Sequence, residues 1–324
     1  AGPHAVFRYD DVFALLRDPS LSVDDRKANH EDNERFQMFE DLLAELGDEA
    51  LQPDQSILGL DPPDHTRLRR LVSKAFTPRT IEALRPRIQE LVDEALDRME
   101  AAGQADVVDE LAFPLPFDVI SEMLGMPEAD KDLIRDWSGA MVKTLDPIIS
   151  EEEARAAFVA ARQMEAHIDR VIEWKRANPA DDLLTALIEA EDDGDRLSAD
   201  ELRDQVVLLF IAGHETTVNL IGTGIQVLLD HPEERQRWAQ DPSLDTSAVD
   251  ELLRFIAPVQ FSRRISTADL DIGGQTIPSG SFVLTCLASA NRDPEFWGPT
   301  ADDLDLGREG SGQHVSFGSG AHYC

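Results

Sequence analysis

Cysteine is nearly absent from this chain, which carries only Cys286 and Cys324 in 324 residues. Two cysteines cannot form a disulfide framework, so we expect a reducing, cytoplasmic setting. Long apolar runs are also absent. The longest clean run is Val206 to Gly213, whereas a membrane-spanning helix needs roughly 18 apolar residues or more. No secretory signal opens the chain, and we predict a soluble protein without a membrane partner.

Positive charge is scarce as well. The chain has 30 Lys and Arg residues against 64 Asp and Glu residues, which gives a formal net charge of −34. A surface with this charge repels phosphate backbones, so we exclude nucleic acid as a partner. Hydrophobic residues make up 42% of the chain, which is enough for a large buried core.

Helical periodicity dominates the rest of the sequence. Thr77 and Pro78 form an N-cap and first-turn pair, and Gly103 ends the apolar pattern that follows them. Ser198 and Glu201 form a capping box that opens a long helix. The helices expected from these patterns span Asp10 to Arg17, Thr77 to Gly103, Glu151 to Arg176, Asp181 to Ala190, Ser198 to Asp230, and Asp245 to Ile256.

A small β part is expected after Val259. Leu270 and Ile272 alternate with acidic residues, and Gly273-Gly274 turns the chain toward Ile277, a pattern typical of a hairpin. We find no linker or internal repeat, so we predict one mainly α domain over residues 1–324. Both ends read as interrupted, because the chain opens close to a helix and closes within a Gly-rich loop; we expect a domain truncated at both ends.

The loop at the end of the chain carries the strongest chemical signal. It reads Phe317-Gly-Ser-Gly-Ala-His-Tyr-Cys324, and its two glycines let the backbone approach a flat ligand closely. A thiolate held there can bind a haem iron. Two other interpretations stay open: an incidental cysteine in a Gly-rich loop, and a zinc cluster of His314, His322 and Cys324, for which no fourth ligand is evident.

The long helix carries a second signal. His214-Glu-Thr-Thr217 interrupts its apolar sequence, and acidic or hydroxyl groups inside a core helix cost free energy unless they are paired or used. Gly213 costs about 1 kcal/mol against Ala in a helix interior, and a small residue there would make room for a ligand. The alternative is a helix kink with a threonine bonded back to the preceding turn.

Charged residues supply two weaker signals. Glu251-Leu-Leu-Arg254 places an ion pair one helical turn apart, which is common on any helix. His65 and Arg69 are four residues apart on one helix face, where two cations repel each other mildly unless an anion lies between them.

Taken in their order along the chain, these motifs resemble the cytochrome P-450 family, whose haem-binding loop is similar to residues 317–324. The resemblance implies the cytochrome P-450 fold, with a long central helix over the haem, and haem b as the cofactor. It implies that Cys324 is the iron ligand and that Glu215 and Thr216 are an acid–alcohol pair that relays protons to dioxygen. The remaining cofactor contacts that it implies are His65, Arg69, Ala212, Gly213, Arg264, His314, Phe317, Gly318, Gly320 and His322. Glu251, Arg254 and Arg308 are implied as a structural ion-pair group that holds the cysteine loop.

The activity implied by the resemblance is that of a soluble, bacterial-type haem-thiolate monooxygenase. Such an enzyme inserts one oxygen atom of O2 into a small hydrophobic substrate, by hydroxylation or epoxidation, as a monomer. Its electrons come from a ferredoxin or flavodoxin-type donor with a reductase. Two alternatives are a peroxide-driven haem-thiolate enzyme and a non-catalytic haem sensor on the same fold. The substrate cannot be read from the sequence.

Overall fold

The computed structural model describes residues 4–29, 34–47, 55–127, 131–146, 148–192 and 194–324. The chain forms two compact units by its internal contacts. The terminal unit comprises Ala1–Glu31 and Thr216–Cys324, and the middle unit comprises Asp32–Glu215. Helices outweigh strands in number and length, which confirms the prediction of a mainly α protein with a small β part. The prediction of a single domain stays a prediction.

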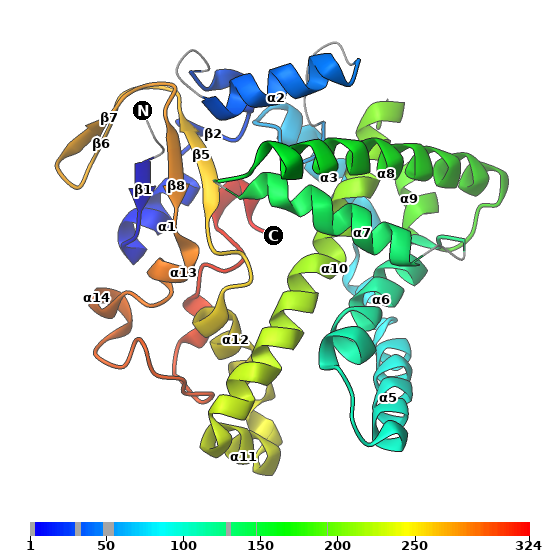
Figure 1. Cartoon of the computed structure of the whole chain (residues 1–324), viewed down its shortest axis with the longest axis vertical. Helices are drawn as coiled ribbons and strands as arrows, with labels where there is room; N and C mark the ends of the chain where they lie inside the picture. Colours follow the sequence, from blue (N-terminus) through cyan, green and yellow to red (C-terminus); the bar gives the residue numbers. More distant parts are fainter. Residues whose placement is uncertain (1–3, 30–33, 48–54, 128–130, 147, 193) are drawn as a thin grey trace. The chain divides into compact units, whose positions relative to one another are not determined.

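The terminal unit is built on a four-stranded sheet with the order β1-β8-β5-β2. Its strands are β1 (His4–Val6), β8 (Phe282–Thr285), β5 (Ser262–Ser266) and β2 (Leu21–Ser22). β1 runs parallel to β8, whereas the other two pairs are antiparallel. α1 (Tyr9–Arg17) and α13 (Leu287–Ala290) pack against each other beside this sheet (Figure 1). Val12, Val283 and Leu287 meet in the core that they share.

The predicted hairpin is present in the terminal unit. β6 (Leu270–Ile272) pairs antiparallel with β7 (Gln275–Ile277). Gly273 and Gly274 form the turn with φ angles of 58° and 76°, a left-handed pair that a two-residue hairpin turn requires. The rest of this unit contains α11 (Pro232–Gln240), α12 (Asp245–Ile256) and α14 (Pro294–Trp297), followed by a mostly irregular segment.

The middle unit is almost entirely helical. Its helices are α2 (Glu34–Glu45), α3 (Asp64–Ala75), α4 (Pro78–Glu82), α5 (Arg85–Ala102), α6 (Pro114–Leu124), α7 (Lys131–Val142), α8 (Glu151–Ala177) and α9 (Leu183–Glu189). A short π-helical turn, η2 (Val108–Ala112), precedes α6. α7 and α8 lie side by side (Figure 1), and the small hairpin of β3 (Glu191–Asp192) and β4 (Asp195–Arg196) follows α9.

α10 (Ala199–Asp230) is the longest helix, and it passes from the middle unit into the terminal unit between Glu215 and Thr216. The predicted capping box opens it: the Ser198 N–H donates to Glu201 at 2.8 Å, and the Glu201 N–H donates to Ser198 Oγ at 3.2 Å. Within the described residues, α10 is the one helix with the length and composition of a membrane span, a feature that the sequence interpretation had not assigned to it.

The helix predicted from Thr77 to Gly103 is wrong as a single element, because α4 and α5 divide it. The two ends were predicted correctly: Thr77 Oγ1 accepts the Thr80 N–H at 3.1 Å, and Gly103 ends α5 with a left-handed φ of 72°. Pro86 explains the break. Its ring has no N–H to donate and would collide with the carbonyl four residues earlier, so a new helix begins there.

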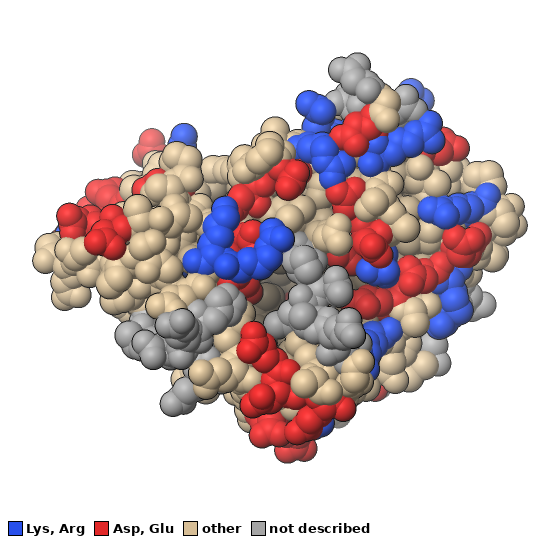
Figure 2. All heavy atoms as spheres, turned by 90° about the horizontal axis from the view of Figure 1, so that it is seen from above, with Lys and Arg blue, Asp and Glu red and all other residues tan. Residues whose placement is uncertain are grey.

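Acidic and basic side chains lie among one another on the face drawn in Figure 2. Figure 2 shows Asp and Glu side chains over much of one face, with Lys and Arg side chains gathered in several groups among them. Many arginines form ion pairs with nearby acids: Arg87 contacts Glu90 and Glu122, and Arg155 contacts Glu45. Such exposed pairs contribute little to stability.

Candidate functional site

The loop that ends at Cys324 is held by its own backbone and by α1. Gly318 and Gly320 have positive φ angles of 71° and 74°, which glycine adopts without strain. A Cβ atom on Gly320 would lie 2.7 Å from the carbonyl oxygen of Leu16, so a larger residue would force this contact apart. The N–H of Cys324 donates to the carbonyl of Phe317 at 3.0 Å. Cys324 itself is exposed and its thiol is free.

The side chain of His314 is turned into the protein. Its Nδ1 accepts the backbone N–H of Ser316 at 3.2 Å, and its Nε2 lies 4.0 Å from Oδ1 of Asp250. Burial lowers the pKa of His314, and the charge of Asp250 offsets this only in part. Both ring nitrogens thus face protein groups. The imidazole therefore helps to hold the loop, and the predicted cofactor contact of His314 stays a prediction.

Phe317 begins the Gly-rich part of the same loop. Its ring is 40% exposed and contacts the rings of His314 and Tyr323, with centroids 5.4 and 6.2 Å apart. An exposed aromatic edge directly before the first left-handed glycine can cover one side of a flat ligand or shield a sulfur from water. This position is compatible with the predicted cofactor contact.

The zinc interpretation of this loop is overturned. Among the described residues, no group of three or more His, Cys, Asp or Glu side chains could hold a metal ion. A structural zinc site needs four such ligands, and His314, His322 and Cys324 do not provide even three of them together. What remains is a single free sulfur.

Glu251 and Arg254 are completely buried on α12 and form a two-pronged ion pair, with N–O distances of 2.7 and 2.8 Å. Arg254 also donates to the carbonyls of Asn291 and Ala301, at 2.8 and 2.7 Å. Arg308 reaches the same carboxylate, with its Nε 3.1 Å from Oε1 of Glu251. The structure thus brings together the three residues that were predicted to form a structural group, and it joins α12 to the irregular segment that precedes the cysteine loop.

Arg264 lies on β5 with only 5% of its surface exposed. Its Nη1 donates to Ser262 Oγ at 2.7 Å and to the carbonyl of Arg263 at 2.8 Å. His322 is half-buried in η6 (Gly320–His322), the 3₁₀ turn just before Cys324. The terminal unit therefore contains the predicted residues Arg264, His314, Phe317, Gly318, Gly320, His322 and Cys324, together with Thr216.

The middle unit contains the other predicted cations, His65 and Arg69, on α3. Burial and the charge of Arg69 lower the pKa of the His65 imidazole, against the opposing charge of Asp61. Arg67, between these two residues on α3, forms ion pairs with Asp195 and Glu201. It therefore ties α3 to the start of α10, a contact that no local pattern in the sequence predicts.

Ala212 and Gly213 lie on α10 and are exposed. A Cβ atom on Gly213 would lie 3.0 Å from Cγ1 and Cδ1 of Ile120 on α6. The small residue at this position therefore allows α6 to approach α10 closely, rather than making room for a ligand on that side. The predicted cofactor contact of Gly213 stays a prediction.

Glu215 is followed directly by Thr216 on α10, and its side chain is 21% exposed. Its Oε1 accepts the hydroxyl of Ser138 on α7 at 2.9 Å and lies 3.3 Å from Nε2 of His214. Burial raises the pKa of Glu215, but the hydrogen bonds from His214 and Ser138 and the charges of His214 and Arg135 outweigh it. The pKa of the carboxyl consequently lies below its usual value, which favours the ionised form.

Ser138 has no signal in the sequence that could have identified it. It lies in an ordinary helical segment, 76 residues before His214, and only the packing of α7 beside α10 brings the two together. His214 was noticed as an interruption of the apolar helix, but no role followed from that pattern alone.

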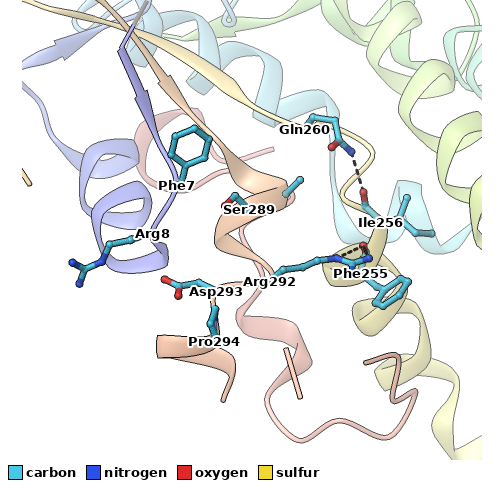
Figure 3. A pocket seen from close by; sticks show the side chains of 10 residues that line it. Phe7, Arg8, Phe255, Ile256, Gln260, Ser289, Arg292, Asp293 and Pro294 are labelled. Atoms are coloured by element: carbon cyan, nitrogen blue, oxygen red, sulfur yellow. Dashed lines mark hydrogen bonds between the residues drawn. The ribbon is translucent and has the colours of Figure 1, made fainter. Parts of the chain in front are cut away.

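A cavity of about 560 Å³ lies elsewhere in the terminal unit, and Figure 3 shows its lining. Phe7 and Arg8 line it together with residues from the end of α12 and from α13. The guanidinium of Arg292 stacks on the ring of Phe255 at 3.8 Å and donates to its carbonyl at 2.8 Å. None of the predicted site residues lines this cavity, so it is distinct from the cysteine loop.

The chemistry of the cysteine loop fits a haem iron. A lone free thiol, glycines that let a flat ring approach and an exposed aromatic edge are what a thiolate ligand of haem needs. Among the described residues, no group of three or more possible metal ligands includes Cys324, which argues against a closed structural metal site.

Comparisons with known proteins agree with this geometry. The family model for cytochrome P450 matches residues 37–241 and 242–324. The chain is 40% identical to cytochrome P450 CYP107DY1 of Priestia megaterium, over 98% of the chain and 76% of that protein. It is 42% identical to a vitamin D(3) 25-hydroxylase of Pseudonocardia autotrophica, over 98% of the chain and 74% of that protein. Among solved structures, the Bacillus subtilis bacillaene polyketide synthase cytochrome P450 PksS superposes with a TM-score of 0.85 at 37% identity, covering 99% of the chain and 76% of PksS.

Proposed function

Because the chain belongs to the cytochrome P450 family and is a haem-thiolate monooxygenase, we propose that it inserts one oxygen atom of O2 into a small hydrophobic substrate, by hydroxylation or epoxidation. The observation that carries this proposal is the free Cys324 thiol at the end of a loop with two left-handed glycines. The names of its relatives include a vitamin D(3) hydroxylase and a polyketide synthase P450, which favours an apolar substrate without fixing its skeleton.

The proposed cofactor is haem b, and Cys324 is the residue that would bind its iron. When bound, the haem would supply the activation of dioxygen. The thiolate would assist by donating electron density. Gly318 and Gly320 let the ring approach the backbone, and Phe317 shields the sulfur from water. For the propionates we propose His65, Arg69, Arg264 and His314. His322 is proposed as a further contact of the cofactor.

Glu215 and Thr216 are proposed to move protons toward the site of oxygen activation. Two findings support this role. The carboxyl of Glu215 is partly exposed, so it can exchange protons with water, and its neighbours favour the ionised form. Thr216 follows it on the same helix, where a hydroxyl can pass on a proton that the carboxyl delivers. Ala212 and Gly213 are proposed as the groove beside this pair.

Electrons are proposed to come from a ferredoxin or flavodoxin-type donor with its reductase, and the enzyme is proposed to act as a cytoplasmic monomer. The two cysteines support a reducing compartment, since both are free thiols. The Lys and Arg groups among the acids in Figure 2 are candidate contacts for an acidic electron donor.

The experiment that tests the proposed function compares two sources of oxidising equivalents. The haem-loaded protein is given an apolar substrate with NAD(P)H, reductase and ferredoxin, or with hydrogen peroxide alone. We expect product in the first reaction and little in the second, because Glu215 and Thr216 serve a dioxygen-dependent route. Product from peroxide alone would support the peroxide-driven alternative. Reduction by ferredoxin without product from any bound compound would support the haem sensor.

A further inference from the structure

His214 is a buried polar residue for which the proposed function has no role. Its side chain is completely buried. Three phenylalanine rings surround it at centroid distances of 5.3 to 5.9 Å, and these are Phe113, Phe117 and Phe210. An imidazole in such a cage is costly unless both nitrogens are satisfied. The surroundings of the two nitrogens therefore decide what His214 does.

The tautomer of His214 follows from its backbone contact. Nδ1 lies 2.7 Å from the carbonyl oxygen of Phe210, one turn earlier on α10. A carbonyl only accepts, so Nδ1 carries a hydrogen. Nε2 is then the nitrogen that can gain or lose a proton, and it faces Ser138 Oγ at 3.0 Å and Oε1 of Glu215 at 3.3 Å.

Two arrangements of hydrogens satisfy the polar atoms of Ser138, His214 and Glu215 that face one another. In the first, Nε2–H donates to Ser138 Oγ, and the Ser138 hydroxyl donates to the Glu215 carboxylate. In the second, a protonated Glu215 donates to Ser138 Oγ, and the hydroxyl donates to a neutral Nε2. The two hold the same number of protons and differ only in whether His214 or Glu215 carries the proton that they share. The Nε2–H and Ser138 O–H bonds break while a new Ser138 O–H and a Glu215 O–H form, so atoms and charge balance.

We propose that Ser138 and His214 are positioning residues that hold the Glu215 carboxyl and share its proton through the serine hydroxyl. This inference rests on the proposed function, since it gives Glu215 its role in proton delivery. The three groups then form one hydrogen-bonded chain that ends at the Glu215 carboxyl. The direction of the Glu215 pKa supports this reading, because the hydrogen bonds from His214 and Ser138 both lower it against burial.

Among the described residues, Arg135 and Phe117 are further groups beside this hydrogen-bonded chain. From α7, Arg135 adds a positive charge; its guanidinium lies 4.4 Å over the Phe113 ring and pairs with Asp109 of η2 at 2.9 Å. From α6, Phe117 contacts the His214 ring. Arg135 therefore favours the ionised carboxylate, but it is 41% exposed on its side chain, where solvent screens its effect. The buried His214 is the stronger partner.

The test measures the infrared carboxyl band of Glu215 as a function of pH in the haem-loaded protein. The band is assigned to Glu215 by its loss in Glu215→Gln. We expect His214→Phe and Ser138→Ala each to move the midpoint of this band upward, because each removes a hydrogen bond that favours the carboxylate. Phenylalanine at position 214 should fit the aromatic cage. If His214→Phe does not fold, Ser138→Ala still tests the inference. Ser138→Thr keeps the hydroxyl and should restore the wild-type midpoint.

His231→Phe is the matched control. His231 also lies 2.8 Å from the carbonyl four residues earlier, Val227, and its ring meets Phe255 edge to face at 5.8 Å. It belongs to a different part of the chain, so the Glu215 band should not move. The pH dependence of product formed per NAD(P)H is the second readout and should shift in the same direction as the band.

Unchanged midpoints in both His214→Phe and Ser138→Ala would overturn the inference. If the wild type still turned over with reductase, the proposed function would stand. If the wild type gave no reductase-driven product while the band moved as expected, the link between Glu215, Ser138 and His214 would stand and the proposed function would fail.

Discussion

Arg308 reaches across the irregular segment before the cysteine loop to the buried Glu251, with its Nε 3.1 Å from Oε1. Glu251 is already paired with Arg254, and Arg254 in turn donates to backbone carbonyls of that segment. The ion pair therefore holds in place the irregular segment that leads to Cys324. Its contribution to stability is the first measurable consequence.

Arg254→Gln is expected to lower the free energy of unfolding by about 3–5 kcal/mol, because it leaves a buried carboxylate without its main partner. Urea unfolding followed by circular dichroism measures this. Arg85→Gln is the matched control: Glu82 and Arg85 have the same spacing, but both are mostly exposed, so the unfolding midpoint should stay unchanged. Equal losses in the two variants would contradict a special role for the buried pair.

Gly125→Ala is expected to destabilise the protein more than Gly103→Ala does. Both glycines end a helix with positive φ, so each substitution costs about 1–2 kcal/mol for the left-handed backbone. At Gly103 the added methyl group meets open space, whereas at Gly125 it would overlap the carboxylate of Asp182. Asp182 is there paired with the buried Lys175 at 2.5 Å. Thermal unfolding measures the difference, and equal losses would show that the pair tolerates the added methyl group.

His167→Phe is expected to make stability less sensitive to acid. Burial, followed by the charge of Arg170, lowers the folded-state pKa of His167 below its unfolded value. The unfolded chain therefore binds this proton first. The stability contributed by the neutral imidazole is complete above about pH 6.5 and is lost as the pH falls toward the folded-state pKa. Relative to wild type, the variant should gain stability between pH 7.5 and 5.5 in urea titrations. A constant difference across that range would contradict the burial of a neutral imidazole.

Thr216→Ala is expected to uncouple electron use from product formation and to release peroxide, because the proposed proton path loses its hydroxyl. The ratio of product to NAD(P)H consumed measures this. Thr223→Ala serves as the control, since Thr223 is an exposed threonine on the same helix. Intact coupling in Thr216→Ala would count against a proton-relay role for this residue.

Local signals in the sequence explain which elements could be predicted. The capping box at Ser198 and the strict periodicity before Ile256 gave α10 and α12 their ends, because those signals act over a few residues. Pro86 was visible in the sequence as well. The prediction nevertheless ran one helix through this proline, because the apolar spacing continues on both sides of it. Contacts between distant segments had no such signal. β1 pairs with β8 across almost the whole chain, and the Arg67 ion pairs form only when α3 packs beside the start of α10.

The residues of the candidate site also fall into those that local sequence signals identify and those that depend on contacts between distant segments. Cys324 and the glycines before it were predictable, because a thiol ligand and a flat ring place strong demands on residues close together in sequence. Glu251, Arg254 and Arg308 could be named from family resemblance, and the structure joins them. The orientation of His314 and the contact of Ser138 with Glu215 depend on neighbours far away in the chain. No local pattern could have supplied them.

The most direct test of the account is the Soret band of the ferrous–CO complex in Cys324→Ala. We predict that the red-shifted band that marks a thiolate ligand is present in the wild type and absent in this variant. Cys286→Ala is the matched control, since it removes the one other cysteine, and it should keep the band. A red-shifted band that persists in Cys324→Ala would contradict the assignment of Cys324 as the iron ligand.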